Sequence, residues 1–163
     1  MTRSDLIREE RTRAKAHVYD FTLWPKLWER FDNRLQYSWT KNRFAKSVID
    51  DIPEKAGVYT FVIEPNIANH PSCAFLVYTG QARDLRARFR QYIGVQEGRR
   101  RHSPIVEQGL SQHANRNYLF FYYSFHKKKA LKKVEQALID GFVPPWNAKK
   151  TISSEVGNIV RAF

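Results

Sequence analysis

Three segments rich in β-branched and aromatic residues constrain the fold of this 163-residue chain more than any other feature. They cover residues 57–63, 75–79 and 118–125, and their composition is typical of β-strands. A short loop with two prolines separates the first two, so we expect an antiparallel hairpin. Helical patterns cover residues 84–93, 104–113 and 127–142. The order β-β-α-α-β-α predicts an α+β domain: a small three-stranded antiparallel sheet flanked by helices.

The first fifty residues have a different pattern. Trp24, Leu27, Trp28 and Phe31 recur at helical spacing, which predicts a buried stripe in an N-terminal helical extension over residues 1–50. A break at Asp51-Ile52-Pro53 opens the domain itself, which we place at residues 51–150. Residues 151–163 then form a C-terminal tail. One domain of this length, with 42% apolar residues, can bury a proper core.

The net charge points to a polyanionic partner. The chain has 28 Lys and Arg against 16 Asp and Glu, a formal charge of +12. Neutralising phosphates releases counterions, so such a chain favours nucleic acid. A membrane partner is not expected, because no stretch approaches the ~20 apolar residues of a spanning helix. The start of the chain has no apolar block of the secretory type, and Cys73 is the only cysteine. Both features indicate a reducing cytoplasm.

Two helices each carry a charge on an apolar stripe. Arg88 lies three residues after Leu85, and Glu135 lies four residues after Leu131. A charge in that position is costly unless it has a partner or faces solvent. One interpretation is a structural ion pair between Arg88 and Glu135. The other is that both charges face a functional site over the hairpin. The helical pattern alone leaves both open.

Further motifs surround these two charges. The strands contain Gly57-Val58-Tyr59 and Tyr78-Thr79-Gly80, and Ala82-Arg83-Asp84-Leu85 follows, with Arg88 ten residues after Tyr78. Glu135 and then Pro144-Pro145-Trp146-Asn147 come later. In this order and spacing, the motifs resemble the GIY-YIG nuclease family over about residues 56–148. Each motif alone is weak, but the ordered set is specific.

The resemblance implies a metal-dependent endonuclease that hydrolyses DNA. Glu135 would be the anchor of a single Mg²⁺, for which Mn²⁺ could substitute, since hard cations prefer oxygen ligands. Arg88 would stabilise charge on the phosphoryl group during in-line attack by water. Tyr78 would act on the attacking water, with Tyr59 as its close neighbour. The remaining site residues are Tyr92, one helical turn after Arg88, and Asn147, which would orient the site by hydrogen bonds.

One departure and one substrate surface complete the expectations. Many relatives carry a lysine where this chain has Gln81, so His102, His113, His126 and Lys127 are unranked candidates for its role. Clustered cations would grip phosphates without reading sequence. The expected contacts are Arg83, Arg86, Arg90, Arg99, Arg100, Arg101, Lys127 and Lys128.

Duplex DNA is the expected substrate, with RNA open, and a restriction, defence or repair role fits the core. Three alternatives stay open at this point. The chain could be a non-catalytic nucleic-acid-binding module or a basic structural protein that uses Arg88 and Glu135 only as a salt bridge. It could also be a nuclease subunit that needs a protein partner or forms a homodimer.

Overall fold

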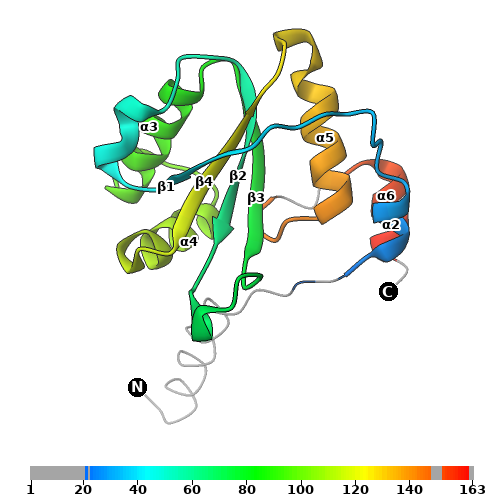
Figure 1. Cartoon of the computed structure of the whole chain (residues 1–163), viewed down its shortest axis with the longest axis horizontal. Helices are drawn as coiled ribbons and strands as arrows, with labels where there is room; N and C mark the ends of the chain where they lie inside the picture. Colours follow the sequence, from blue (N-terminus) through cyan, green and yellow to red (C-terminus); the bar gives the residue numbers. More distant parts are fainter. Residues whose placement is uncertain (1–20, 22, 148–151, 162–163) are drawn as a thin grey trace, which may run out of the picture.

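A four-stranded sheet forms the centre of the molecule. The computed structural model describes residues 21, 23–147 and 152–161. The strands follow one another across the sheet as β1 (Thr40–Arg43), β4 (Leu119–Phe125), β2 (Gly57–Ile63) and β3 (Phe75–Ala82). Every neighbouring pair is antiparallel, and β2 and β3 form the expected hairpin. β1 and β3 are therefore the two edges of the sheet (Figure 1).

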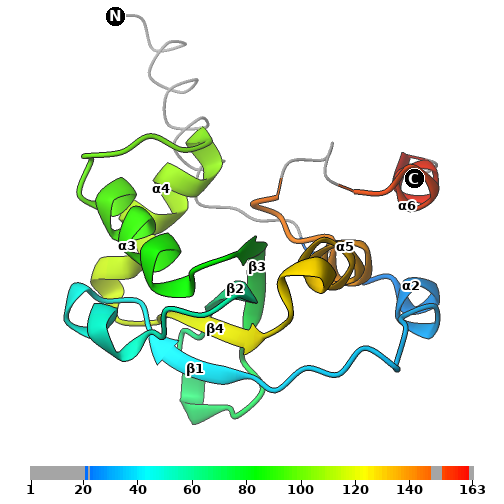
Figure 2. The same cartoon turned by 90° about the horizontal axis from the view of Figure 1, so that it is seen from above.

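Helices cover both faces of this sheet (Figure 2). α3 (Leu85–Gln96) and α4 (Pro104–His113) pack together on one face, and α5 (Leu131–Phe142) lies against the other. α2 (Pro25–Glu29) and α6 (Ser154–Arg161) lie beyond α5 (Figure 2). Short 3-10 segments also occur in the described residues: η1 (Lys46–Asp51), η2 (Ile67–Asn69), η3 (Ala114–Arg116) and η4 (Lys128–Ala130). The fold is α+β, as the sequence predicts.

Two hydrophobic clusters hold these layers together. The larger joins the sheet to α3 and α4, and includes Tyr59, Phe61, Leu85, Phe89, Leu110 and Phe121. The smaller joins Val58 of β2 to three residues of α5. Side chains alternate along a strand, so successive residues of β2 enter opposite clusters. All seven residues of β2 are buried, as a central strand covered on both faces requires.

The prediction of three strands was one strand short. β1 belongs to the segment assigned to the helical extension, and it pairs with β4 from Thr40↔Tyr123 to Arg43↔Phe120. Its sequence Thr-Lys-Asn-Arg has no apolar alternation, so no pattern identifies it. Its charged side chains suit an edge strand. The expectation for residues 1–20 lies outside the described residues, and the division into 1–50, 51–150 and 151–163 stays a prediction.

Two residues of the expected apolar stripes are exposed. Leu27 is buried as expected, but Trp28 is 46% exposed. α2 has only five residues, and so short a helix turns only part of its surface to its neighbours. The stripe of α5 consists of Leu131, Val134, Leu138 and Phe142. Its first three residues are buried, whereas Phe142 is 50% exposed. Phe142 is the last residue of the helix, beyond the part that packs on the sheet. Within the described ranges, none of the helices has the length and apolar character needed to cross a membrane.

Asp84 provides a test of the local fold. Its carboxylate accepts a hydrogen bond of 2.9 Å from the Ala87 N–H and so caps α3. The Asp84→Ala variant should lose about 1 kcal/mol of unfolding free energy, because that N–H loses its partner. Asp84→Asn keeps an acceptor oxygen and is the matched control, with a loss of at most a few tenths of a kcal/mol. Urea denaturation measures both, and an undiminished stability of Asp84→Ala would contradict the cap.

Candidate active site

The residues expected to carry chemistry gather around β3, the edge strand. Tyr78 stands opposite Phe61 in the β2–β3 register, and Gln81 stands opposite Val58. Because Phe61 and Val58 belong to different clusters, Tyr78 faces α3 and α4 while Gln81 faces α5. Arg88 on α3 and Glu135 on α5 reach this edge from opposite faces of the sheet. Both influence the pKa of Tyr78, so the structure brings these residues into one site.

Three tyrosines form the floor of this site. The hydroxyl groups of Tyr59 and Tyr92 are 2.9 Å apart and hydrogen-bonded. The ring of Tyr78 lies 6.3 Å from that of Tyr59 and 6.1 Å from that of Tyr92, centroid to centroid. Tyr59 and Tyr92 are 2% and 1% exposed, whereas Tyr78 is half-buried. Tyr78 is therefore the phenol of the three that a substrate can reach most readily.

The glycines of both strand motifs make room for this packing. A Cβ atom on Gly80 would lie 2.4 Å from the Tyr59 hydroxyl oxygen, across the strand pair. A Cβ atom on Gly57 would lie 2.5 Å from the Ser124 carbonyl oxygen. Contacts that short do not occur, so each position needs a residue without a side chain. Gly80 thus lets the Tyr59 side chain lie against β3, and Gly57 lets β4 approach β2 closely.

Burial keeps all three tyrosines neutral. Desolvation is the largest influence on each, and it raises the pKa of Tyr59, Tyr78 and Tyr92 above the ordinary value for tyrosine. Hydrogen bonding to Tyr92 and the positive charge of Arg88 act in the opposite direction on Tyr78. A phenol in this site can thus become a base only with more positive charge beside it.

Glu135 is held by Gln81 of β3. The Gln81 Nε2 group donates a hydrogen bond of 2.7 Å to Glu135 Oε2. Burial raises the pKa of Glu135, while the bond from Gln81 and the charge of Arg88 partly offset the shift. Gln81 fixes the carboxylate without neutralising it. Sequence reasoning noted Gln81 as a departure, but only the cross-sheet geometry shows what it contacts.

Arg88 and Glu135 do not form the structural ion pair that the helical pattern allows. Among the described residues, no salt bridge within 4.0 Å joins them, and the Arg88 guanidinium has no ion-pair partner. Arg88 is nevertheless half-buried and acts on the pKa of four neighbours: Tyr59, Tyr78, His102 and Glu135. An arginine held in this way, without a carboxylate, is poised to bind an anion.

Asn147 fixes the backbone of β3 beneath the site. Its Oδ1 atom accepts a hydrogen bond of 2.9 Å from the Thr79 N–H, and its Nδ2 atom donates one of 2.8 Å to the Thr79 carbonyl. The neighbouring Trp146 N–H donates to the Val77 carbonyl at 2.8 Å. These bonds satisfy an outer strand edge that would otherwise be open. Asn147 is thus a positioning residue, because its side-chain amide bonds to the backbone of Thr79.

His102 is the histidine that the structure brings to the site. Its ring centroid lies 5.5 Å from that of Tyr92 and 6.1 Å from that of Tyr78. Desolvation and then the charge of Arg88 lower its pKa, which keeps the ring neutral. The Ser103 N–H donates to Nδ1 at 2.8 Å, so the proton of the neutral ring is on Nε2.

The other candidates for the lysine role are elsewhere. His113 packs against Trp146 and Tyr118, and His126 packs against Tyr37. Lys127 is exposed where the chain leaves β4. No sequence signal ranks His102 above them, because it stands in a loop without periodicity.

The basic residues divide into engaged and available groups. Arg86 donates to Ile52 O at 2.6 Å, to Asp50 O at 3.0 Å and to Glu54 at 2.7 Å. It therefore ties α3 to the segment before β2, and its role as a phosphate contact stays a prediction. Arg99 and Arg101 pair with Glu97 and Glu107 respectively.

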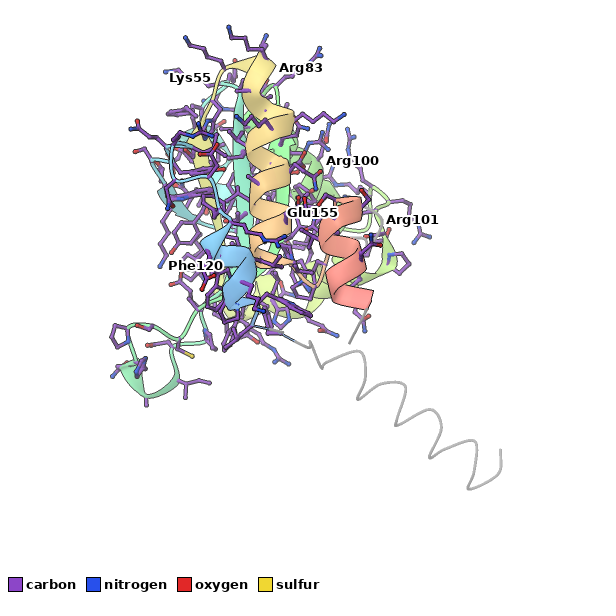
Figure 3. All side chains as sticks on the ribbon, turned by 90° about the vertical axis from the view of Figure 1, so that its right-hand side faces the viewer. Lys55, Arg83, Arg100, Arg101, Phe120 and Glu155 are labelled. Atoms are coloured by element: carbon purple, nitrogen blue, oxygen red, sulfur yellow. The ribbon has the colours of Figure 1, made fainter. Side chains whose placement is uncertain are left out.

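The available group lies around the site and at one end of the sheet. Among the described residues, the exposed cations without an ion pair within 4.0 Å include Arg83, Arg90, Arg100, Lys127 and Lys128. Arg83 lies at the end of the molecule where α5 begins, and Arg100 lies further along the same side (Figure 3). These five remain candidates for phosphate contacts.

Comparisons with known proteins find similar structures only. No protein-family model matches the chain, and no curated protein matches it. The solved structures include the GIY-YIG N-terminal endonuclease domain of UvrC from Thermotoga maritima, as point mutants bound to its catalytic divalent cation. One is 18% identical, with a TM-score of 0.44, over 63% of this chain and 93% of that chain. Another is 18% identical, with a TM-score of 0.42, over 64% and 99%. These solved domains carry the family name that the sequence motifs indicate.

Asn147 yields a prediction about the strand edge. In Asn147→Ala, the backbone N–H and the carbonyl of Thr79 both lose their partner. The free energy of unfolding should therefore fall by about 1–3 kcal/mol. The Thr79 amide should also exchange with solvent faster than its neighbours in β3. Urea denaturation and amide hydrogen exchange measure the two effects. Asn33→Ala, an exposed asparagine between α2 and β1, is the control, and a Thr79 amide that stays protected in Asn147→Ala would refute the clamp.

Glu135 yields a prediction about pH. Its raised pKa means that the folded protein binds the carboxyl proton more tightly than the unfolded chain does. The stability that Glu135 contributes is present below its ordinary pKa of 4.5 and is lost as pH rises through the raised value. Wild type should therefore lose stability relative to Glu135→Gln between pH 4.5 and 7.

Urea denaturation at both pH values, with exposed Glu29→Gln as control, tests this expectation. An ion-paired Glu135 would give the reverse trend, because pairing lowers a carboxyl pKa and wild type would gain stability over the variant.

Proposed function

We propose that this chain is a metal-dependent endonuclease that hydrolyses DNA phosphodiester bonds by in-line attack of water. The observation that carries this proposal is the Arg88 guanidinium. It is half-buried without a carboxylate partner, beside three tyrosines and across the β3 edge from Glu135. A cation held in that state is suited to a substrate anion. A phosphodiester is the anion that fits a chain of net charge +12.

Glu135 is the residue that would hold a divalent cation. The described residues contain no group of three or more His, Cys, Asp and Glu that could form a closed metal cluster. One fixed carboxylate with water as the remaining ligands suits Mg²⁺, with Mn²⁺ as a substitute. When bound, the cation supplies positive charge to the phosphoryl oxygens and the leaving oxygen. Gln81 keeps the carboxylate turned toward the β3 edge by its hydrogen bond.

Tyr78 acts as the general base for the attacking water. The water oxygen forms the new bond to phosphorus, the bond to the 3′ oxygen breaks, and the 3′ oxygen takes a proton from solvent and leaves as a hydroxyl. The Tyr78 oxygen, ionised to the phenolate, accepts the proton lost by the water. Its pKa is raised by burial, so it takes this role only when Arg88 and added positive charge oppose that shift. The products are a 5′-phosphate and a 3′-hydroxyl.

The remaining residues keep Tyr78 and the phosphate in place. Tyr59 and Tyr92 share a hydrogen bond beneath Tyr78 and restrict where its ring can move. Arg88 stabilises the charge that grows on the phosphoryl oxygens. His102 adds a neutral imidazole beside Tyr78 and Tyr92, with a proton on Nε2 that it can donate in place of the family's lysine.

One surface favours a second candidate, a nuclease that works with a protein partner. The exposed side chains of Trp28, Trp39 and Phe142 are all at least 40% exposed. Hollows of about 290 and 360 Å³ next to α2 and α5 both include Phe31 and Phe142 in their lining. Large apolar groups that stay exposed are common at docking surfaces. Cleavage that requires a second protein would favour this candidate.

Plasmid cleavage tests the proposed function. Wild type incubated with supercoiled DNA should nick or linearise it with Mg²⁺ or Mn²⁺ and leave it intact with a chelator. The folded Glu135→Ala variant should lose at least about 100-fold in rate, the scale expected when a transition-state contact is removed. Glu29→Ala, an exposed acid on α2, is the matched control and should cut like wild type.

Two results would overturn the proposal. Cutting that survives the chelator or the Glu135→Ala change would remove Glu135 from the reaction. A folded wild type that binds DNA but never cuts it would favour the binding module instead.

A further inference from the structure

An exposed aromatic ring stands in a basic hollow beside the proposed site. Phe125, the last residue of β4, is 47% exposed. It lines an open hollow of about 460 Å³ together with Lys55, Ala56, His126, Lys127 and Lys128. No acidic residue lines this hollow, so its electrostatic character is positive. The mechanism proposed above uses none of these residues.

The lysines of this hollow are available for a ligand. The Lys55 ammonium lies 5.2 Å from the centroid of the Phe125 ring, over its face. In the described part of the chain, Lys55, Lys127 and Lys128 have no ion pair within 4.0 Å. Lys127 and Lys128 also lie within four residues of the start of α5, the end of the helix where its dipole disfavours positive charge. Folding therefore does not account for this cluster of cations.

The hollow lies close to the proposed site along the sheet. Gly57 of β2 pairs with Phe125 on one side and with Ala82 on the other, next to Gln81 in β3. Neighbouring strands are about 4.8 Å apart, so Phe125 is roughly 10 Å across the sheet from the β3 edge. Lys55 and Arg83 both lie at the end of the molecule where α5 begins (Figure 3). A nucleic acid strand at the site can therefore reach this hollow within a few nucleotides.

We propose that Phe125 stacks against an unpaired base of the substrate strand, while Lys55, Lys127 and Lys128 bind the flanking phosphates. An aromatic ring among cations is the pairing that proteins use for single strands, because every base offers a π-face. Lys55 is exposed and can move from the ring to a phosphate when a base arrives. The substrate is then DNA with an unpaired or unstacked nucleotide near the cut. This inference rests on the proposed function for its link to cleavage.

Binding to a cleavage-inactive protein tests the proposal separately from catalysis. Glu135→Gln, without added metal, is titrated with two fluorescein-labelled oligonucleotides of equal length, one single-stranded and one fully paired. Adding Phe125→Leu should weaken single-strand affinity about tenfold, within the range for loss of one stacked base. The affinity for the paired oligonucleotide should change less than twofold. Phe125→Trp should restore single-strand binding, because an indole also stacks.

Control variants separate stacking from general effects. Phe142→Leu removes an equally exposed phenylalanine at the end of α5 and should leave both affinities unchanged. Lys55→Gln should reduce the slope of log affinity against log salt by about 0.7, the value for one phosphate contact on a single strand. Circular dichroism melting establishes that each variant is folded.

The outcomes decide the proposal either way. Equal losses on single-stranded and paired DNA, or no loss in Phe125→Leu, would overturn it. If single-strand binding depends on an aromatic residue at position 125 but wild type never cuts plasmid DNA, the stacking proposal stands and the proposed nuclease function is refuted. Failure of the stacking proposal can therefore be distinguished from failure of the proposed function.

Discussion

The pair of hydrogen bonds between Asn147 and the backbone of Thr79 is the constraint on which the site depends. β3 is an edge strand, so its outer N–H and C=O groups would otherwise be open to water or to another strand. A side-chain amide presents a donor and an acceptor in one plane and therefore replaces a neighbouring strand over one residue. The backbone between Tyr78 and Gln81 is thereby fixed, and these two side chains leave it toward opposite faces of the sheet.

An edge strand also explains how distant helices meet at one place. A central strand has both faces covered and both sides paired, so helices on its two faces are separated by the sheet itself. At β3 the sheet ends, and groups from α3 and α5 act on the same tyrosine around that end. Arg88 there lowers the pKa of Glu135 without forming a salt bridge with it. The space between opposite charges held apart in this way is suited to a phosphate and a cation together.

Much of this arrangement could be predicted from the sequence, and the exceptions have physical causes. The strands at 57–63 and 75–79 follow from their β-branched and aromatic composition, and the helices that carry Arg88 and Glu135 follow from the periodic spacing of their apolar residues. The sequence of β1 has neither an apolar composition nor an apolar repeat. This strand forms because its backbone pairs with the free edge of β4. Loop residues have no periodicity either, so the place of His102 beside Tyr92 could not be inferred. Arg86 looks like any other surface arginine until its three acceptors are seen.

The strand β1, which the sequence did not predict, limits how far the chain can be shortened from its N-terminal side. β1 lies before residue 51, yet it closes one side of β4, a strand of seven residues rich in aromatic side chains. A chain beginning at residue 51 would keep every motif of the proposed site and would leave the backbone of β4 without a partner along that side. Such an open edge is a template for pairing with a second chain. The charged segment Thr40–Arg43 therefore covers an edge that would be prone to intermolecular pairing, while the proposed catalytic site lies at the opposite edge of the sheet.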